Sequence, residues 1–274
     1  FVNTVLATGE GTGAVSWLNY AFRLMYLPIG LFGVSIATAT LPAVSRHLAR
    51  DDRGAVRAEV ASGLSLMMML NVPATAGLMV LATPIVRVIF ERNAFTPADT
   101  AATAAALQFY AIGLLGYSVV RITSPIFYAL GSNRIPVMVS IATVLANAAL
   151  NVVLVRLLGF RGLALGTSIA ALFNGAVLLV LLGRQLDGLE ARRVAASLAK
   201  IAVASLIMAA AARAVDAGLE TWAGGMGFMG QVIRLAASIG CALGVLAAGA
   251  YILRIKEFGD GLALVMRRLG RTAR

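Results

Sequence analysis

The chain has 274 residues, of which 60% are hydrophobic and only 13% are charged, and its mean hydropathy is +0.89. This composition excludes an ordinary soluble domain and indicates an all-α integral membrane protein, a polytopic helix bundle. The formal net charge of +11 would suggest a nucleic-acid partner in a soluble protein. Here the basic residues cluster between apolar segments, so we predict that they set the membrane topology and that no nucleic acid is bound.

The chain opens with FVNTVLATGEG, which we expect to be a truncated first span over 1–8 in a fragment of a longer protein. A spanning helix needs about 20 mostly apolar residues. The connections are short, with Pro97 at an expected helix start and GFRG (159–162) as a tight turn, so consecutive helices are expected to be antiparallel neighbours. Full spans are predicted near 14–45, 61–90, 98–130, 136–158, 162–184, 194–216 and 228–254.

The basic residues predict the direction of the chain in the membrane. Fifteen Lys and Arg residues lie in the segments after the second, fourth, sixth and eighth spans, whereas the opposite segments contain five. By the positive-inside rule, the 46–60 loop and the C-terminus are expected in the cytoplasm. The basic tail 255–274 favours contact with the anionic membrane lipids of the inner leaflet. Three arginines remain within spans, and Arg234 is expected to reach the interface from a helix end.

Arg23 is predicted about 15 Å into its span, where a charge costs roughly 2.5–3.5 kcal/mol on insertion scales. We identify no acidic residue within the spans to neutralise it. The guanidinium is either held by groups of neighbouring helices or faces a hydrated cavity and receives an anion such as a phosphate. So costly a charge favours a ligand, and one helical face is predicted to carry Ser16, Asn19, Arg23, Tyr26 and Gly30. Asn19, Arg23 and Tyr26 are therefore candidate substrate-binding residues.

Pro28 removes a backbone hydrogen bond and is expected to bend this span beside Gly30. The bend is either a hinge for a cavity that opens alternately to each side of the membrane or a static kink that improves packing. Arg121 lies four residues before Pro125. It serves either as a second cationic substrate-binding residue or as a residue that reaches the cytoplasmic interface.

Asn147 and Asn151 are four residues apart on one helical face, and Thr167 and Asn174 lie on the following helix. Amides at this spacing either hold helices together by hydrogen bonds or supply oxygen ligands for a small cation. The sequence has no paired carboxylates, no nucleophile beside a base, no metal-ligand cluster and no phosphate-binding glycine loop. We therefore expect a protein that is not an enzyme and has no catalytic residue.

Two segments resemble a known family. SWLNYAFRLMYLPIGLFGVSIATATLPAVSRHLA (16–49) is similar to the MurJ (MviN) family of lipid II flippases, in which a YA-x-RLM-x-x-P-x-G helix is followed by LP-x-x-S. SPIFYALGSNRIPV (124–137) is similar to the same family's proline–x–Phe–Tyr segment. The resemblance covers essentially the whole chain, as the C-terminal part of a member of the multidrug/oligosaccharidyl-lipid/polysaccharide exporter superfamily.

The resemblance implies a bundle of two pseudo-symmetric lobes with two additional C-terminal helices. Residues 1–185 would be the C-terminal lobe, 186–254 the additional pair along which the substrate's lipid tail runs, and 255–274 a cytoplasmic tail. The implied activity is transport of the undecaprenyl-diphosphate-linked peptidoglycan precursor across the bacterial cytoplasmic (inner) membrane. Arg23 matches the cavity arginine that engages the diphosphate. The missing N-terminal lobe would be the partner that alternating access requires.

The chain departs from the family pattern at two places. Phe22 precedes the matched arginine where the family often has Asp, so a local acid–arginine pair is absent. Amides stand at the possible carboxylate positions of a sodium site, so the ligands lack the negative charge that favours sodium, and we expect no cofactor other than, at most, a sodium ion. The resemblance implies that this site comprises Asn3, Asn147, Asn151, Leu163 (backbone carbonyl) and Thr167.

Two alternative functions stay open at this point. A related exporter would move another polyprenyl-diphosphate-linked oligosaccharide or a cationic drug, although an unpaired cavity arginine repels a cation in a low-dielectric site. A non-transporting membrane scaffold would tolerate the loss of Arg23, whereas a flippase would not.

Overall fold

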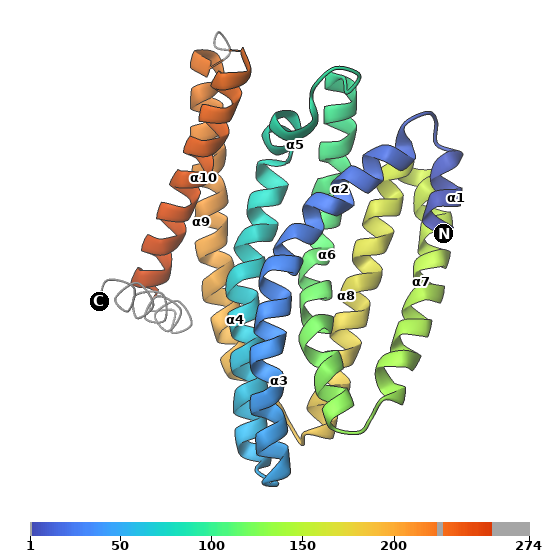
Figure 1. Cartoon of the computed structure of the whole chain (residues 1–274), viewed down its shortest axis with the longest axis vertical. Helices are drawn as coiled ribbons and strands as arrows, with labels where there is room; N and C mark the ends of the chain where they lie inside the picture. Colours follow the sequence, from blue (N-terminus) through green and yellow to red (C-terminus); the bar gives the residue numbers. More distant parts are fainter. Residues whose placement is uncertain (1, 224–226, 254–274) are drawn as a thin grey trace.

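The computed structural model describes residues 2–223 and 227–253, and every regular element within these ranges is a helix (Figure 1). This confirms the predicted all-α class. The long helices run roughly along one axis and alternate in direction, as their short connections require. In chain order the elements are α1 (Val2–Thr8), α2 (Ala14–Pro28), the π-helix η1 (Ile29–Gly33), α3 (Val34–Ala49), α4 (Arg53–Val80), α5 (Ala82–Phe90), α6 (Pro97–Ala129), α7 (Arg134–Leu158), α8 (Phe160–Gln185), α9 (Ala191–Ala223) and α10 (Gly227–Ile252).

Six of the described helices are long and apolar enough to cross a membrane, and the bent pair α2–α3 adds a seventh. The polytopic helix bundle is therefore confirmed. The predicted GFRG turn shortens to one residue, Gly159, whose positive φ of 60° separates α7 from α8. The predicted basic tail 255–274 lies outside the described residues.

The predicted span 61–90 is wrong at both ends. α4 already begins at Arg53, because the Asp52 side chain accepts a hydrogen bond from a backbone amide of the first turn (2.9 Å) and caps the helix. The helix then ends at Val80, and α5 follows as a separate short helix. Pro84 explains the break, since it has no amide hydrogen to donate to the Val80 carbonyl.

The predicted span 194–216 is too short. α9 continues to Ala223, so it contains Glu220 as well as Asp216, which is already the last residue of the predicted span. The expectation that the spans contain no acidic residue is therefore wrong for α9.

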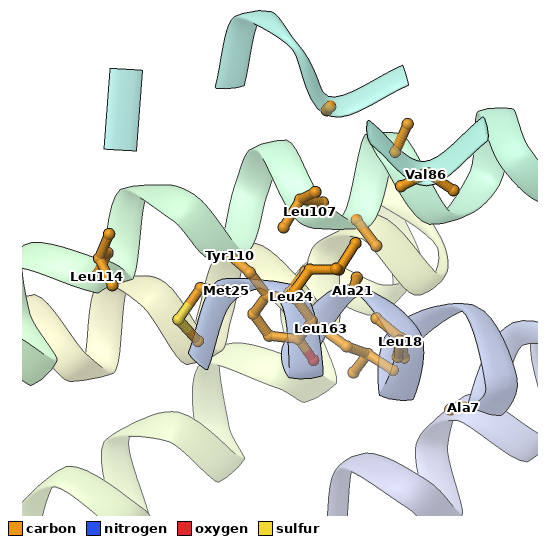
Figure 2. Close-up of a cluster of buried hydrophobic side chains, with 14 of the residues drawn as sticks. Ala7, Leu18, Ala21, Leu24, Met25, Val86, Leu107, Tyr110, Leu114 and Leu163 are labelled. Carbon is orange, nitrogen blue, oxygen red and sulfur yellow. The ribbon is translucent and has the colours of Figure 1, made fainter. Parts of the chain in front are cut away.

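α6 is the central helix of the bundle. It packs so closely on α8 that a β-carbon on Gly116 would overlap the backbone of Ala171. α9 and α10 form a hairpin that packs on α4 and α5 (Figure 1). α7 packs mainly on α8 and keeps much of its apolar surface exposed. α2, α5, α6 and α8 share one hydrophobic core (Figure 2), to which α2 contributes Leu18, Ala21, Leu24 and Met25.

Candidate functional site

α2 has one side in the core and one side outside it. Because Leu18, Ala21, Leu24 and Met25 point into the core, the opposite side of the helix is exposed. The predicted face is therefore present, and we call it the α2 polar face: it consists of Ser16, Asn19, Arg23, Tyr26 and Gly30, all of which are exposed. Arg23 makes no ion pair or hydrogen bond with any residue that the structure describes. Its guanidinium is thus available to an anion from outside the described part of the chain.

The predicted bend lies where α2 ends at Pro28. The π-helical turn η1 follows, and the helix axis changes direction by 42° between Ala14–Leu31 and Ile36–Ala49. Gly30 lies inside η1, and a β-carbon built on it would meet open space. Packing therefore does not require glycine at this position. The bend occurs where the sequence predicts it. Whether the angle between α2 and α3 changes during transport, as a hinge would require, stays a prediction.

Tyr26 and Arg121, which the sequence assigns to different spans, line one cavity of about 290 Å³. We call it the Tyr–Arg cavity. Within the described residues Arg121 has no ion-pair or hydrogen-bond partner, and its aliphatic stem lies against η1, since a β-carbon on Gly33 would be 3.5 Å from Arg121 Cγ. The polar or aromatic residues of the wall are Tyr26, Tyr117, Arg121, Ser124 and Tyr128.

The five predicted sodium ligands come together in one hydrogen-bonded group that joins α1, α7 and α8. Asn151 Nδ2 donates to Asn3 Oδ1 (2.6 Å) and to Asn147 Oδ1 (3.1 Å). Asn3 Nδ2 donates to Thr167 Oγ1 (3.0 Å), which in turn donates to the Leu163 carbonyl (2.8 Å). We call this group the amide network. The sequence therefore predicted correctly which residues meet.

The amide network does not fit a resident sodium ion as it stands. Two of its amide oxygens accept from Asn151 Nδ2, and no ligand carries a charge. Asn151 Oδ1 is buried without a partner and lies so close to Gly166 that a β-carbon there would overlap it. Asn174 lies outside the network, with a buried Oδ1 that has no partner among the described residues. The geometry thus supports the alternative in which the amides hold the helices together.

A second cavity of about 180 Å³ lies beside the amide network. Its lining includes Asn3 and Thr167 of the amide network, Asn19 of α2 and Tyr110 of α6. The predicted substrate-binding residues are therefore divided. Asn19 faces this cavity, Tyr26 and Arg121 line the Tyr–Arg cavity, and Arg23 lies on the exposed face between Asn19 and Tyr26.

Arg234, which the sequence predicts to reach the interface from a helix end, is paired within the protein. Its Nε and Nη2 donate to the two carboxylate oxygens of Asp216 in α9, at 2.6 and 2.9 Å. Both side chains are largely buried, with 13% and 5% of their surfaces exposed. Arg213 and Glu220 extend the cluster at 3.6 and 3.5 Å. The third intramembrane arginine is therefore a structural link between α9 and α10.

The sequence interpretation missed two tyrosines of the Tyr–Arg cavity. Tyr117 and Tyr128 are four residues before and seven residues after Arg121. This spacing places them on the same face of α6, so the pattern was available in the sequence.

Together, the long apolar helices and the bent helix, whose Arg23 has no partner among the described residues, define a polytopic helical membrane protein with small polar cavities. A structure described as "Lipid II flippase MurJ, inward closed conformation" is similar to this chain, with a TM-score of 0.72, 25% identity, and coverage of 92% of this chain and 50% of that chain. A family model described as "Lipid II flippase MurJ" matches residues 1–233. The chain belongs to the lipid II flippase MurJ family, which confirms the resemblance inferred from its motifs.

Two curated relatives show how much of the family's length the chain represents. The "Probable lipid II flippase MurJ" of Vibrio cholerae serotype O1 is 35% identical over 202 residues, which cover 73% of this chain and 38% of the relative. The "Lipid II flippase MurJ" of Burkholderia cenocepacia is 35% identical over 188 residues, 69% of this chain and 36% of the relative. A multidrug resistance MATE family transporter shares only the fold, with a TM-score of 0.55 and 14% identity. The chain spans less than half the length of these two curated relatives.

Proposed function

We propose that this chain is the C-terminal part of a bacterial inner-membrane flippase that moves the undecaprenyl-diphosphate-linked peptidoglycan precursor from the inner to the outer leaflet. Residues 1–185 are the C-terminal lobe in this proposal, and 186–254 are two additional helices. The observation that carries the proposal is the exposed, unpaired Arg23 at the motif position of the family. The process makes and breaks no covalent bond.

Arg23 binds the diphosphate of the substrate in this proposal. Guanidinium presents parallel N–H groups that match two phosphate oxygens, and such charge-assisted bonds are strong where water is scarce. Neighbouring groups on the α2 polar face, from Asn19 and Tyr26, supply further hydrogen-bonding contacts. Arg121 lines the neighbouring Tyr–Arg cavity and, in this proposal, binds the part of the substrate headgroup that lies beyond the diphosphate.

Transport follows from alternating access between this lobe and an N-terminal lobe. The bend at Pro28 and Gly30 changes the angle between α2 and α3, which opens the α2 polar face to one side of the membrane at a time. In this proposal the arginine-rich segments lie in the cytoplasm, including the C-terminus and residues 46–60, which form the end of α3 and the start of α4 rather than a loop. The amide network holds α1, α7 and α8 together by uncharged hydrogen bonds. No step of the proposed transport depends on a cation bound there.

The experiment that tests this function is complementation of a flippase-depleted bacterial strain by the two-lobe protein that contains this chain. Arg23→Ala should abolish growth, because it removes the charge that binds the diphosphate. Arg156→Ala is the matched control, since Arg156 is also exposed and lies in a spanning helix but outside both cavities. Normal growth of Arg23→Ala at wild-type expression would contradict the proposal and favour a scaffold.

Lipid binding by the same two-lobe protein distinguishes a lipid II flippase from a related exporter. Purified protein should bind lipid II in preference to other polyprenyl diphosphates carrying unrelated oligosaccharides. Equal binding of all these lipids would favour an exporter of broader specificity.

A further inference from the structure

The Tyr–Arg cavity contains more hydrogen-bonding groups than the protein uses. The phenols of Tyr26, Tyr117 and Tyr128, the guanidinium of Arg121 and the hydroxyl of Ser124 all belong to its wall. None of these groups forms a hydrogen bond or an ion pair with a residue that the structure describes. Polar groups in a cavity that the protein leaves unsatisfied are available to water and to a ligand.

The aromatic part of the wall is held in place by Phe22. The rings of Phe22 and Tyr26 are stacked, with centroids 5.8 Å apart and planes at 28°. Phe22 also meets Tyr117 edge to face, at 6.5 Å and 83°. The residue that replaces an acid next to Arg23 therefore braces two rings of the cavity.

This combination of groups matches a sugar ring better than a bare anion. The C–H faces of a pyranose pack on aromatic rings, while its hydroxyls and any acetamido group exchange hydrogen bonds with phenols and guanidinium. A site for phosphate alone would not need three aromatic walls. The volume, about 290 Å³, lies at the lower end of ligand pockets and suits one ring rather than a whole headgroup.

The cavity also has the right position relative to Arg23. Tyr26 is three residues further along the same face of α2, about 4.5 Å along the helix axis. A group bound by Tyr26 is thus adjacent to a diphosphate bound by Arg23. We propose that the Tyr–Arg cavity binds a sugar ring of the polyprenyl-diphosphate-linked substrate, an inference that rests on the proposed function.

The test compares two lipids, undecaprenyl diphosphate without sugar and lipid II, binding to the two-lobe protein in lipid nanodiscs. Tyr128→Leu and Arg121→Gln should each weaken binding of lipid II about tenfold, while the dissociation constant for undecaprenyl diphosphate changes less than twofold. Tyr128 is 52% exposed, so its replacement should leave the fold intact. Tyr128→Phe, which keeps the ring, should retain most of the preference.

Two controls separate this inference from the proposed function. Tyr251→Leu replaces a tyrosine that is 80% exposed on α10, and it should leave both dissociation constants unchanged. Arg23→Ala should weaken binding of both lipids equally, and if it weakens neither, the proposed function fails independently of the cavity. Equal losses for both lipids in Tyr128→Leu and Arg121→Gln, or no loss in either variant, would overturn the sugar site.

Discussion

Arg23 is exposed because its neighbours in sequence are buried. Leu24 and Met25 enter the core shared with α6 and α8, and a helix that buries them must turn residue 23 to the opposite side. The helical periodicity of apolar and polar residues along α2 was sufficient to predict that Arg23 lies outside the core. The same reasoning predicted which polar residues share that face, since 3.6 residues per turn fixes their spacing.

Asn151 offers a test of the amide network at the scale of one residue. The wild-type protein should unfold at the same temperature in sodium and in potassium chloride, because the network lacks a negative ligand. Asn151→Asp should make the unfolding temperature higher in sodium, since a buried carboxylate gains a cation that binds only the folded state. Thermal unfolding in the two salts measures the difference. Asn133→Asp, at an exposed position in the connection before α7, is the control and should show no such difference.

The amide network and the Arg234–Asp216 pair show why residue-level prediction succeeded in one case and failed in the other. The network residues could be grouped by family resemblance and by their four-residue spacing, and the hydrogen bonds join the same five. Arg234 was predicted to be interfacial because it lies near the beginning of its own span. Its partner Asp216 is in another helix, and periodicity within one helix does not reveal such a contact.

At the scale of the element, the bend between α2 and α3 can be tested at Gly30. Gly30→Ala adds a methyl group in open space, so it should not disturb packing. Alanine favours regular helix by up to about 1 kcal/mol over glycine, which stiffens the turn. If the bend moves during transport, flipping by the two-lobe protein should slow several-fold while its unfolding temperature stays equal or rises. Reconstituted flipping of labelled lipid II measures this effect.

Gly240→Ala is the matched control for that experiment, because Gly240 also lies in a helix with open space around it. It should raise stability similarly and leave the flipping rate unchanged. A wild-type rate for Gly30→Ala would favour the static kink.

The link between α9 and α10 gives a second prediction for an element. Asp216→Asn should leave Arg234 without its carboxylate in a largely buried position and destabilise the hairpin by about 3–5 kcal/mol. Asp216→Asn combined with Arg234→Gln should be less destabilising than the single change, since it leaves no charge unpaired. Glu190→Gln, which breaks an exposed pair with Arg193, should cost less than about 1 kcal/mol. Chemical unfolding of the purified protein compares the three variants.

The sequence predicted most helices but not all of their ends. Apolar length was enough for α6 to α8 because their flanks carry strong turn signals, such as Pro97 and Gly159. It failed at the end of α4, because the sequence stays mostly apolar on both sides of the break near Pro84. The π-helical turn η1 was also missed, since a proline predicts a bend but not the hydrogen-bond pattern that accommodates it.

At the scale of the whole molecule, the two ends of the bundle differ in charge. The α3–α4 and α8–α9 connections lie at the same end of the bundle (Figure 1), and the helix ends that flank them are rich in arginine. At this end Asp187 pairs with Arg53 at 3.0 Å, but most of the arginines there remain exposed. The excess positive charge resists translocation, so this end should remain in the cytoplasm.

Cysteine labelling tests that orientation in cells. After Cys241→Ser removes the single native thiol, Asn133→Cys places one thiol in the connection between α6 and α7, at the arginine-rich end. Ala94→Cys places one in the exposed connection between α5 and α6, at the opposite end. A membrane-impermeant maleimide should label position 94 in intact spheroplasts and position 133 only after permeabilisation. The reverse pattern would mean that the arginine-rich end faces outward, and the proposed direction of transport would then lose its topological basis.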